Sequence, residues 1–465
     1  MVGIEGVNTS RIMVLRSTII ADASLLRAFS RLEPYGSIML AVSGGPDSMA
    51  LMVLARRWLQ LTARNAAAIM VATVDHGLRP ESGQEAAFVA AQASNLGFAH
   101  ATLAWTGEKP KTGVQAEARR ARYDLLISKA LVGGAAALVT AHTEDDQAET
   151  LLMRLARGSG LDGLAAMAPV SHRNGLAIVR PLLGFSKARL TAYLRAASVP
   201  FLRDPSNENT AFERVRLRSA TKALASAGIA RSSLATTAAR LNRSRDALAS
   251  ITEDFLDRHF EVAPLGHGKI SHAALEAVPA DIAIRALSRI FSLISGKEEP
   301  PRLVKVEQIF SSLPLRKAKT TFGGCIMIAA SGTLYFYREP GRLKAKDTPL
   351  EPGGNYIWDG RFVLIYGPAG DRSLAVRQLG ATGWLLYKKA IKAEGLSVEA
   401  NRLAALTIPA LWKGNRLMCV PLLSFSDLEG MQVEAALVPG LARFLTAIPD
   451  EDAGLLGKGT LTSYL

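Results

Sequence analysis

The residues best suited to chemistry form a short loop, Ser43-Gly44-Gly45-Pro46-Asp47-Ser48, that directly follows an apolar run. Two adjacent glycines let the backbone approach an anion and turn successive N–H groups toward it. Pro46 suits the first turn of a helix, whose N-terminus favours negative charge. Bare phosphate would repel Asp47, so this carboxylate indicates phosphate bound through Mg²⁺. The loop predicts a nucleotide-phosphate site, with an ordinary strand-to-helix turn as the alternative.

A second polar run, His142-Thr143-Glu144-Asp145-Asp146-Gln147-Ala148-Glu149, also follows an apolar run. Its four carboxylates in six positions repel one another unless cations lie among them. Asp145, Asp146 and Glu149 would project from the first turn of a helix. They predict a pocket for Mg²⁺ and for a substrate that carries an ammonium group. Plain helix capping by acids that the helix dipole favours is the alternative.

Further candidates stand outside these two runs. Asp75 ends an apolar run, where a carboxylate is placed to hold Mg²⁺ or a ribose hydroxyl; we therefore predict Mg²⁺ on Asp47 and Asp75. On a helix Arg119, Arg122 and Tyr123 would share one face, from which guanidinium groups reach a phosphate or a base edge. A solvated basic face is the alternative.

The elements that must position these groups alternate between short and long segments. Strands are predicted at residues 37–42, 68–75, 136–141 and 177–181, and helices at 48–61, 81–96, 115–131 and 145–157. Alternation with near-continuous apolar strands favours an α/β fold with a parallel sheet covered on both faces. Ligands bind such sheets at the carboxyl ends of the strands, where the candidate residues lie.

After about residue 218 the alternation of predicted strands and helices ends. Leu234, Leu241, Leu248 and Phe255 recur every seven residues, which indicates either a coiled coil or the core stripe of a helical domain. A second helical segment at 273–296 is interrupted at Pro279, and from about residue 320 the pattern turns to hairpins around Ser331-Gly332 and Asp359-Gly360. Residues 343–354 look like a linker. We predict an N-terminal extension (1–36), a catalytic α/β domain (37–218), a mostly helical domain (219–342) and a small α+β domain (343–465).

Composition limits the class of protein. The 465 residues carry a net charge of +14, which predicts a polyanionic partner such as nucleic acid. Two cysteines are too few for a disulfide framework, a Cys-rich zinc site or a fully Cys-ligated iron–sulfur cluster. No apolar run approaches the ~20 residues of a membrane span, and no secretory signal is recognisable. We expect a cytoplasmic protein without a membrane partner.

The loop resembles the Ser-Gly-Gly-x-Asp-Ser signature of the N-type ATP pyrophosphatases, which cleave ATP between the α- and β-phosphates. Three further motifs narrow the resemblance: Asp-His-Gly-Leu-Arg at 75–79, His-x-x-Asp-Asp-Gln-Ala-Glu-Thr at 142–150 and Arg-Gly-Ser-Gly at 157–160. Together they are similar to the tRNA(Ile)-lysidine synthase family over about residues 37–218. Arg203 and Val215 depart from that family, which usually has Glu and Asn there.

The resemblance implies a reaction. ATP adenylates the carbon-2 oxygen of the wobble cytidine in the CAU anticodon of tRNA(Ile), and the ε-amine of free L-lysine then displaces AMP. The product, lysidine, changes the codon and amino-acid specificity of the tRNA from Met to Ile. ATP and Mg²⁺ are implied as cofactors, and a second copy of the chain, in a homodimer, as a further partner.

The resemblance also implies roles for individual residues. Catalysis is expected from Asp47, Asp75, Asp145 and Arg119. ATP is expected on Ser43, Gly44, Gly45, Pro46, Asp47 and Ser48, and lysine on Asp145, Asp146 and Glu149. The tRNA is expected on Arg122, Arg154, Arg157, Arg214 and Arg218, and on the two domains at 219–342 and 343–465.

Three alternatives remain open from the sequence. A tRNA thiolase shares the loop, but its sulfur chemistry usually needs cysteines near the site, and here both lie beyond residue 320. A small-molecule ligase such as NAD synthase would not need basic C-terminal domains. A tRNA-binding protein with an inactive site would not need an intact loop and acid run.

Overall fold

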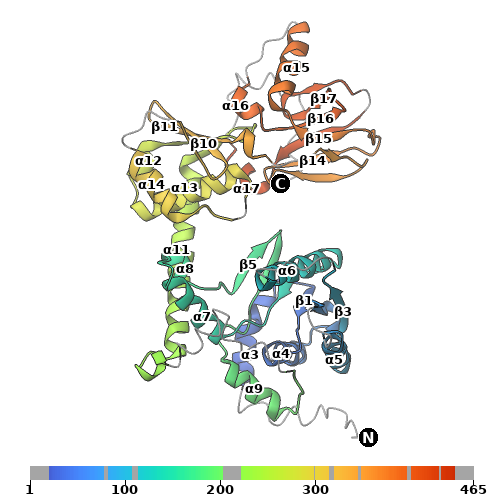
Figure 1. Ribbon diagram of the computed structural model, residues 1–465, viewed down its shortest axis with the longest axis vertical. Helices are drawn as coiled ribbons and strands as arrows, with labels where there is room; N and C mark the ends of the chain where they lie inside the picture. Colours follow the sequence, from blue (N-terminus) through green and yellow to red (C-terminus); the bar gives the residue numbers. More distant parts are fainter. Residues whose placement is uncertain are drawn as a thin grey trace. The chain divides into compact units, whose positions relative to one another are not determined.

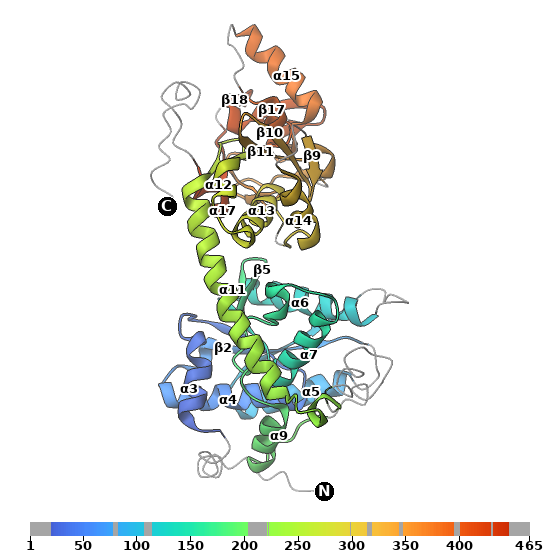
Figure 2. The same cartoon turned by 90° about the vertical axis from the view of Figure 1, so that its left-hand side faces the viewer.

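The structure, a computed structural model, describes residues 20–77, 82–106, 114–202, 221, 223–297, 299–313, 319–343, 347–394, 400–428 and 431–445. The chain forms two compact units, Met1–Asp246 and Ala247–Leu465 (Figure 1). The boundary between them falls inside helix α11 (Arg231–His259), which Figure 2 shows as one continuous helix. Among the described residues, no helix is both long enough and apolar enough to cross a bilayer.

A six-stranded sheet forms the centre of the first unit. Its strands are β1 (Ile38–Ala41), β2 (Ile69–Asp75), β3 (Ala99–Ala104), β4 (Ala137–Val139), β5 (Val170–Arg173) and β6 (Leu176–Val179), in the order β3-β2-β1-β4-β6-β5. All neighbours run parallel except the edge strand β5, which pairs antiparallel with β6. The predicted parallel sheet is thus confirmed. Strands β3 and β5 were not predicted, because half-exposed residues replace the apolar runs that mark the central strands.

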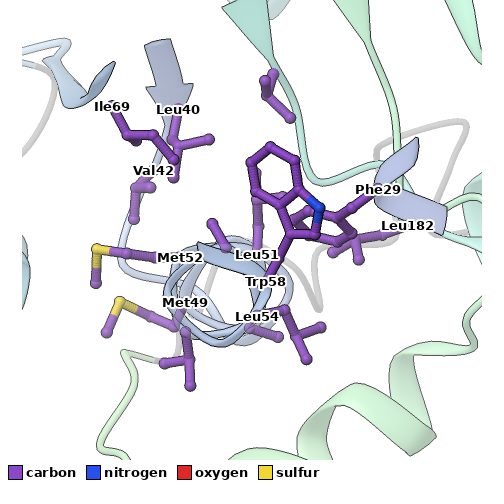
Figure 3. Close-up of a cluster of buried hydrophobic side chains, with 14 of the residues drawn as sticks. Phe29, Leu40, Val42, Met49, Leu51, Met52, Leu54, Trp58, Ile69 and Leu182 are labelled. Atoms are coloured by element: carbon purple, nitrogen blue, oxygen red, sulfur yellow. The ribbon is translucent and has the colours of Figure 1, made fainter. Parts of the chain in front are cut away.

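Helices cover both faces of this sheet. One face packs against α3 (Asp22–Phe29), α4 (Pro46–Thr62), α5 (Ser82–Asn95) and α9 (Lys187–Ala196), and the other against α6 (Val114–Val132). Figure 3 shows the first of these cores, where Trp58 of α4 lies near Phe29 and Leu182. Burying these large apolar side chains is the main favourable contribution to folding of the unit.

The residues before β1 contribute to this core. Leu25, Phe29 and Leu32 are fully buried, and the Phe29 and Trp58 rings lie 5.9 Å apart. The buried Arg57 side chain donates a hydrogen bond to the Ile20 carbonyl (2.9 Å). We predicted residues 1–36 as an N-terminal extension. The described part of this segment instead packs into the core of the six-stranded sheet.

Helix α11 begins on the first unit. Its Ala238 is fully buried against Leu151 of α7 (Glu144–Leu155) and Ala166, which follows α8 (Leu161–Leu164). The buried Asn242 side chain donates to the Ala165 carbonyl (3.3 Å). The first half of α11 is thus held to α7 and to the turn after α8.

The second half of α11 enters the core of the second unit, where Phe255 and Leu256 are buried. The sheet there has the order β7-β8-β11-β10-β9, with β7 (Phe260–Val262), β8 (Gly268–Ser271), β9 (Lys319–Phe322), β10 (Cys325–Ala330) and β11 (Thr333–Arg338). This sheet shares its hydrophobic core with three helices, α12 (His272–Glu276), α13 (Ala280–Ser295) and α14 (Leu303–Ser312). Residues that we predicted as mostly helical therefore also build an antiparallel sheet, while the interruption at Pro279 and the Ser331-Gly332 hairpin are confirmed.

Two further antiparallel sheets complete the unit. One contains β12 (Thr348–Pro349), β15 (Ala375–Gln378), β16 (Pro409–Lys413), β17 (Arg416–Val420) and β18 (Phe425–Ser426), and the other β13 (Asn355–Trp358), β14 (Phe362–Tyr366) and β19 (Val433–Leu437). Helices α15 (Gly380–Ala393), α16 (Arg402–Ala405) and α17 (Pro439–Ala442) complete the described elements. The Asp359-Gly360 turn has the two positive φ angles of a tight hairpin, as predicted. Leu350 is fully buried, so the segment predicted as a linker takes part in the fold.

A buried charge network joins β11 to this turn. Arg338 Nε and Nη2 donate to the two oxygens of the Asp359 carboxylate, at 2.8 and 2.9 Å. Arg361 donates to the same carboxylate (3.0 Å) and to the Thr407 carbonyl (2.7 Å). Two buried guanidinium groups thus share one carboxylate, and each also has a carbonyl partner.

Candidate active site

The phosphate loop connects β1 to α4. The Ser43 N–H donates to the Ser48 hydroxyl (3.1 Å), which donates to the Gly45 carbonyl (3.0 Å). Gly45 caps α4 without a side chain, and Pro46 occupies the first turn. The two serines thus close the loop on itself at the N-terminus of a 17-residue helix. Such a terminus is an anion site, because its N–H groups and dipole favour negative charge.

Gly44 carries the backbone conformation that the loop needs. Its φ of +84° lies in the left-handed region, and an added Cβ would lie 2.7 Å from Leu202 Cδ1. The Leu202 N–H donates to the Gly44 carbonyl (2.9 Å). The segment after α9 therefore packs against the phosphate loop at Gly44. No local pattern in the sequence indicates this contact.

The acid run lies at the start of α7, after β4. Thr143 and Asp146 form a capping box: the Thr143 N–H and hydroxyl donate to Asp146 Oδ2 at 2.9 and 2.7 Å, and the Asp146 N–H lies 3.4 Å from the Thr143 hydroxyl. Helix capping, the alternative to a pocket, is thus present. It uses one oxygen of one carboxylate, whereas Asp145 and Glu149 are also buried on the same helix.

The two runs come together because β1 and β4 are neighbours in the sheet, with Leu40 opposite Val139. The chain passes from β1 to β2 and β3 on one side and returns to β4 on the other. This reversal of strand order is the place where open α/β sheets bind ligands. The phosphate loop and the acid run therefore lie close together at the carboxyl edge of the sheet.

Lys187 links the two runs through contacts that we did not predict. Its ammonium nitrogen lies 3.3 Å from Asp47 Oδ2 and 3.1 Å from Asp146 Oδ1, and its backbone N–H donates to Asp145 Oδ2 (2.8 Å). It stands at the first position of α9, where the helix dipole disfavours a cation. That unfavourable placement is the one signal in the sequence that an acid lies nearby.

The pKa values of the two carboxylates that Lys187 contacts shift in opposite directions. Burial raises the pKa of Asp47, and the Lys187 ammonium only partly opposes this. For Asp146 burial acts in the same direction, but Lys187 and the two donors of Thr143 outweigh it, so the pKa is lowered. Asp47 Oδ1 is buried without a hydrogen-bond partner among the described residues. An acceptor of this kind fits a Mg²⁺ ligand, although no cluster of three or more His, Cys, Asp or Glu residues in the described part could bind a metal by itself.

Asp75 ends β2, as predicted. Its Oδ1 accepts the Gly77 N–H (2.8 Å), which orients the carboxylate within a turn at the carboxyl edge of the sheet. Because β2 pairs with β1, this is the edge that carries the phosphate loop. A single protein carboxylate pair is a usual Mg²⁺ site when phosphates complete the coordination.

His142 is a buried residue of the site to which we had assigned no role. Its Nδ1 lies 2.9 Å from the Thr140 hydroxyl. Burial lowers the pKa of His142 to about 3; Asp146 opposes this, while Arg180, Arg119 and Arg122 act with it. The imidazole is therefore neutral at physiological pH and acts through hydrogen bonds.

An arginine cluster surrounds Tyr123 on α6. The guanidinium carbons of Arg119, Arg122 and Arg173 lie 5.4, 5.9 and 5.3 Å from the centre of the Tyr123 ring. Cations at this distance are attracted to the ring face. The predicted shared face of Arg119, Arg122 and Tyr123 is confirmed, and the influence of both arginines on His142 places the cluster beside the acid run.

The other residues predicted to contact tRNA do not belong to the arginine cluster at Tyr123. Arg154 donates to the Gly163 carbonyl (3.0 Å) and is half-buried, so it orders the turn at α8, whereas Arg157 is exposed. Arg214 and Arg218 lie outside the described residues, as do Arg203 and Val215.

Comparisons with known proteins agree with this geometry. Residues 20–224 match the family model of the PP-loop domain. A tRNA(Ile)-lysidine synthase of Bradyrhizobium sp. (strain BTAi1) is 46% identical over 324 residues, 68% of this chain and 89% of that protein. Another, from Ruegeria pomeroyi, is 40% identical over 403 residues, 86% of this chain and 92% of that protein.

Among solved structures, a U34-tRNA thiolase from Methanococcus maripaludis is similar over 48% of this chain and 77% of its own, with a TM-score of 0.41 and 14% identity. That similarity says nothing about the reaction. The relatives share far more of the sequence, over nearly their full length. Because of this sequence identity and coverage, the chain belongs to the tRNA(Ile)-lysidine synthase family.

Proposed function

We propose that this chain uses ATP to join free L-lysine to carbon-2 of the wobble cytidine of tRNA(Ile) with the CAU anticodon, forming lysidine and releasing AMP and pyrophosphate. The observation that carries the proposal is the meeting of an anion-binding loop and an acid cluster at the ends of neighbouring strands. One half of this site suits phosphates, and the other suits an amine.

In the first half-reaction the loop binds the phosphates of ATP. The backbone of Ser43–Ser48 and the start of α4 hold the pyrophosphate end, while Asp47 and Asp75 would hold Mg²⁺. The metal ion would neutralise charge on the phosphate oxygens when bound. Adenylation turns the carbon-2 oxygen of cytidine, a poor leaving group, into part of AMP. Arg119 and Arg122 would bind negative charge on the reacting phosphate and on the flanking nucleotide.

In the second half-reaction the ε-amine of lysine displaces AMP. The amine attacks as the neutral form, so an acidic residue must hold it and accept a proton. Asp145, Asp146 and Glu149 are the proposed lysine-binding residues. The contact of Asp146 with the Lys187 ammonium, at 3.1 Å, supports this proposal, because an alkylammonium group of the chain itself already pairs with the cluster.

Charge and cysteine placement favour this reaction over its rivals. The net charge of +14 suits a tRNA partner, and Arg154, Arg157, Arg214 and Arg218 are proposed to contact its backbone. Both cysteines, Cys325 and Cys419, are buried in the second unit, where burial raises their pKa values to about 12 and about 11. Such thiols are poor nucleophiles, which argues against sulfur transfer.

The direct test is incubation of the protein with ATP, labelled L-lysine and a tRNA(Ile) transcript. We expect label in the RNA, with one AMP and one pyrophosphate released per lysine incorporated. A matched transcript with uridine in place of the wobble cytidine should remain unlabelled. Absence of label from the first transcript, or equal label in both, would refute the proposal.

A homodimer is a separate proposal, supported by the family resemblance alone. Sedimentation velocity at micromolar concentration should give the mass of two chains, twice 49.6 kDa. A mass of one chain across the concentration range would refute it. A cytoplasmic location is likewise proposed, and fractionation of cells that express the protein tests it.

A further inference from the structure

Asp145 is held from two directions by parts of the chain far away in sequence. Its Oδ1 accepts a hydrogen bond from Arg231 Nη1 (2.9 Å), and its Oδ2 accepts one from the Lys187 N–H (2.8 Å). The carboxylate is mostly buried, with 11% of the side chain exposed. A buried carboxylate fixed at both oxygens has one orientation, which is the condition for positioning a substrate.

Arg231 is itself held in place. Its Nη2 donates to the Thr221 hydroxyl (3.2 Å), so the guanidinium group bridges Asp145 and Thr221. It is the first residue of α11, where the helix dipole disfavours a cation. The ion pair with Asp145 offsets the unfavourable interaction of the Arg231 charge with the helix dipole.

The docking of α11 determines where Arg231 lies. Ala238, two turns further along the helix, packs against Leu151 of α7, and Asn242 donates to the carbonyl of Ala165. The helix therefore follows α7 from its acidic first turn to its C-terminal half. Because both apolar and polar contacts fix α11, the position of Arg231 relative to Asp145 is fixed as well.

Asp145 lies among other acidic side chains. Asp145 acts on Asp47 and on Glu144 as a like charge and raises the pKa of each, although burial is the larger cause in both residues. Without Arg231, Asp145 Oδ1 would lose its hydrogen-bond donor and the carboxylate would be held at one oxygen only. The orientation that a substrate amine meets would then be lost.

We propose that Arg231 is a positioning residue: it acts through Asp145, whose carboxylate it holds in the orientation that receives the amine of the lysine substrate. This inference rests on the proposed function, because lysine binding by Asp145 is part of that proposal. Because Arg231 acts through Asp145, its removal should affect the lysine step and leave ATP binding intact.

The test compares steady-state lysine transfer by wild type, Arg231→Met and the control Arg243→Met. Arg243 lies on the same helix, is exposed, and its removal changes the net charge by the same amount. We expect Arg231→Met to raise KM for lysine roughly tenfold, with KM for ATP and for tRNA within about twofold of wild type. Arg243→Met should match wild type in all three. Arg231→Lys keeps the charge but loses the two-armed contact, so it should fall between wild type and Arg231→Met.

A double-mutant cycle identifies the route of the effect. If Arg231 acts through Asp145, adding Arg231→Met to Asp145→Asn should change KM for lysine by less than about twofold. Independent, multiplicative effects would overturn the proposal, as would a rise in KM for tRNA in place of lysine. Should Arg231→Met fail to fold, Arg231→Lys carries the same cycle.

Failure of the inference is distinguishable from failure of the proposed function. A wild-type protein that transfers no lysine refutes the function. A wild-type protein that is active, with Arg231→Met indistinguishable from Arg243→Met, refutes only the role of Arg231.

Discussion

Asp47 and Asp146 share one ammonium group, that of Lys187, although one carboxylate follows β1 and the other follows β4. Their pKa values nevertheless shift in opposite directions, because Thr143 donates to Asp146 and burial dominates at Asp47. The protein therefore supports the charge of Asp146 by itself and leaves that of Asp47 under-compensated. This difference supports the proposal that Asp47, rather than Asp146, holds Mg²⁺.

Replacing Asp47 should abolish turnover. We expect Asp47→Ala to lower pyrophosphate release by at least about a hundredfold, because the phosphate site loses its acidic ligand. Release of pyrophosphate during the lysine reaction is the measurement. Asp254→Asn, an exposed acid on α11, is the control and should keep wild-type rates. Turnover by Asp47→Ala at the wild-type rate would remove Asp47 from the site.

Gly44→Ala should destabilise the phosphate loop. The left-handed backbone costs a residue with a Cβ about 1–2 kcal/mol, and contact with Leu202 adds to it. We expect weaker ATP binding by calorimetry and a lower midpoint of thermal unfolding. At Gly36 an added Cβ meets nothing within 4 Å, so Gly36→Ala is the matched control for both measurements. Equal unfolding midpoints for the two variants would contradict the assigned strain.

Glu149→Gln should impair lysine binding more than ATP binding. The substitution keeps the size of this buried side chain and removes its charge, which is the feature that an ammonium group requires. Steady-state kinetics with each substrate varied in turn give the two KM values. We expect the KM for lysine to rise by roughly tenfold or more and that for ATP by less than about twofold. Equal increases would count against a lysine-binding role.

The elements that carry the site could be predicted, because their signals are local. Apolar strands, the glycine loop and the acid run each lie within about ten consecutive residues, and the structure has them where the pattern put them. The helix at Arg231–His259 was likewise marked by its seven-residue repeat.

The partners of the acids could not be predicted in this way. Lys187 lies 42 residues from Asp145, and Arg231 lies 86 residues from it. Contacts at such separations depend on how helices pack on the sheet, which no short pattern encodes. The support of Gly44 by Leu202 and the burial of the residues before β1 have the same tertiary origin.

Stability of the first unit should fall with pH below about 6.5, in part through His142. The pKa of His142 is about 3 in the folded protein, against 6.5 for the free side chain, and burial is the main cause. Between these values the unfolded chain binds the extra proton, so stability is lost as pH falls. From pH 7 to pH 5 this one group should cost about 2 kcal/mol.

His142→Asn isolates this contribution. Asn does not titrate and can still hydrogen-bond to Thr140, so urea unfolding of the variant should depend less steeply on pH between 7 and 5. His267, whose pKa burial also lowers, to about 4, remains in both proteins and cancels in the comparison. Identical slopes would contradict a neutral, buried His142.

The charge network of the second unit should be worth far more than a surface ion pair. Asp359→Asn leaves two buried guanidinium groups, those of Arg338 and Arg361, without their counter-charge, which should cost about 3–5 kcal/mol. Asn tolerates the positive φ of this position, so the turn itself is preserved. Asp427→Asn, which breaks the exposed pair with Arg416, should cost less than about 1 kcal/mol. Denaturant unfolding compares the two, and similar losses would refute the difference.

Burial of both thiols makes the chain a convenient host for site-directed probes. Cys325 is 0% exposed and Cys419 3% exposed, and neither forms a thiolate readily at neutral pH. A maleimide dye should therefore leave the native protein unlabelled. A cysteine introduced at an exposed position, such as Ser232 on α11, would then be the single reactive group. Fluorescence from that position would report on the start of α11 while substrates bind, with no native cysteine removed.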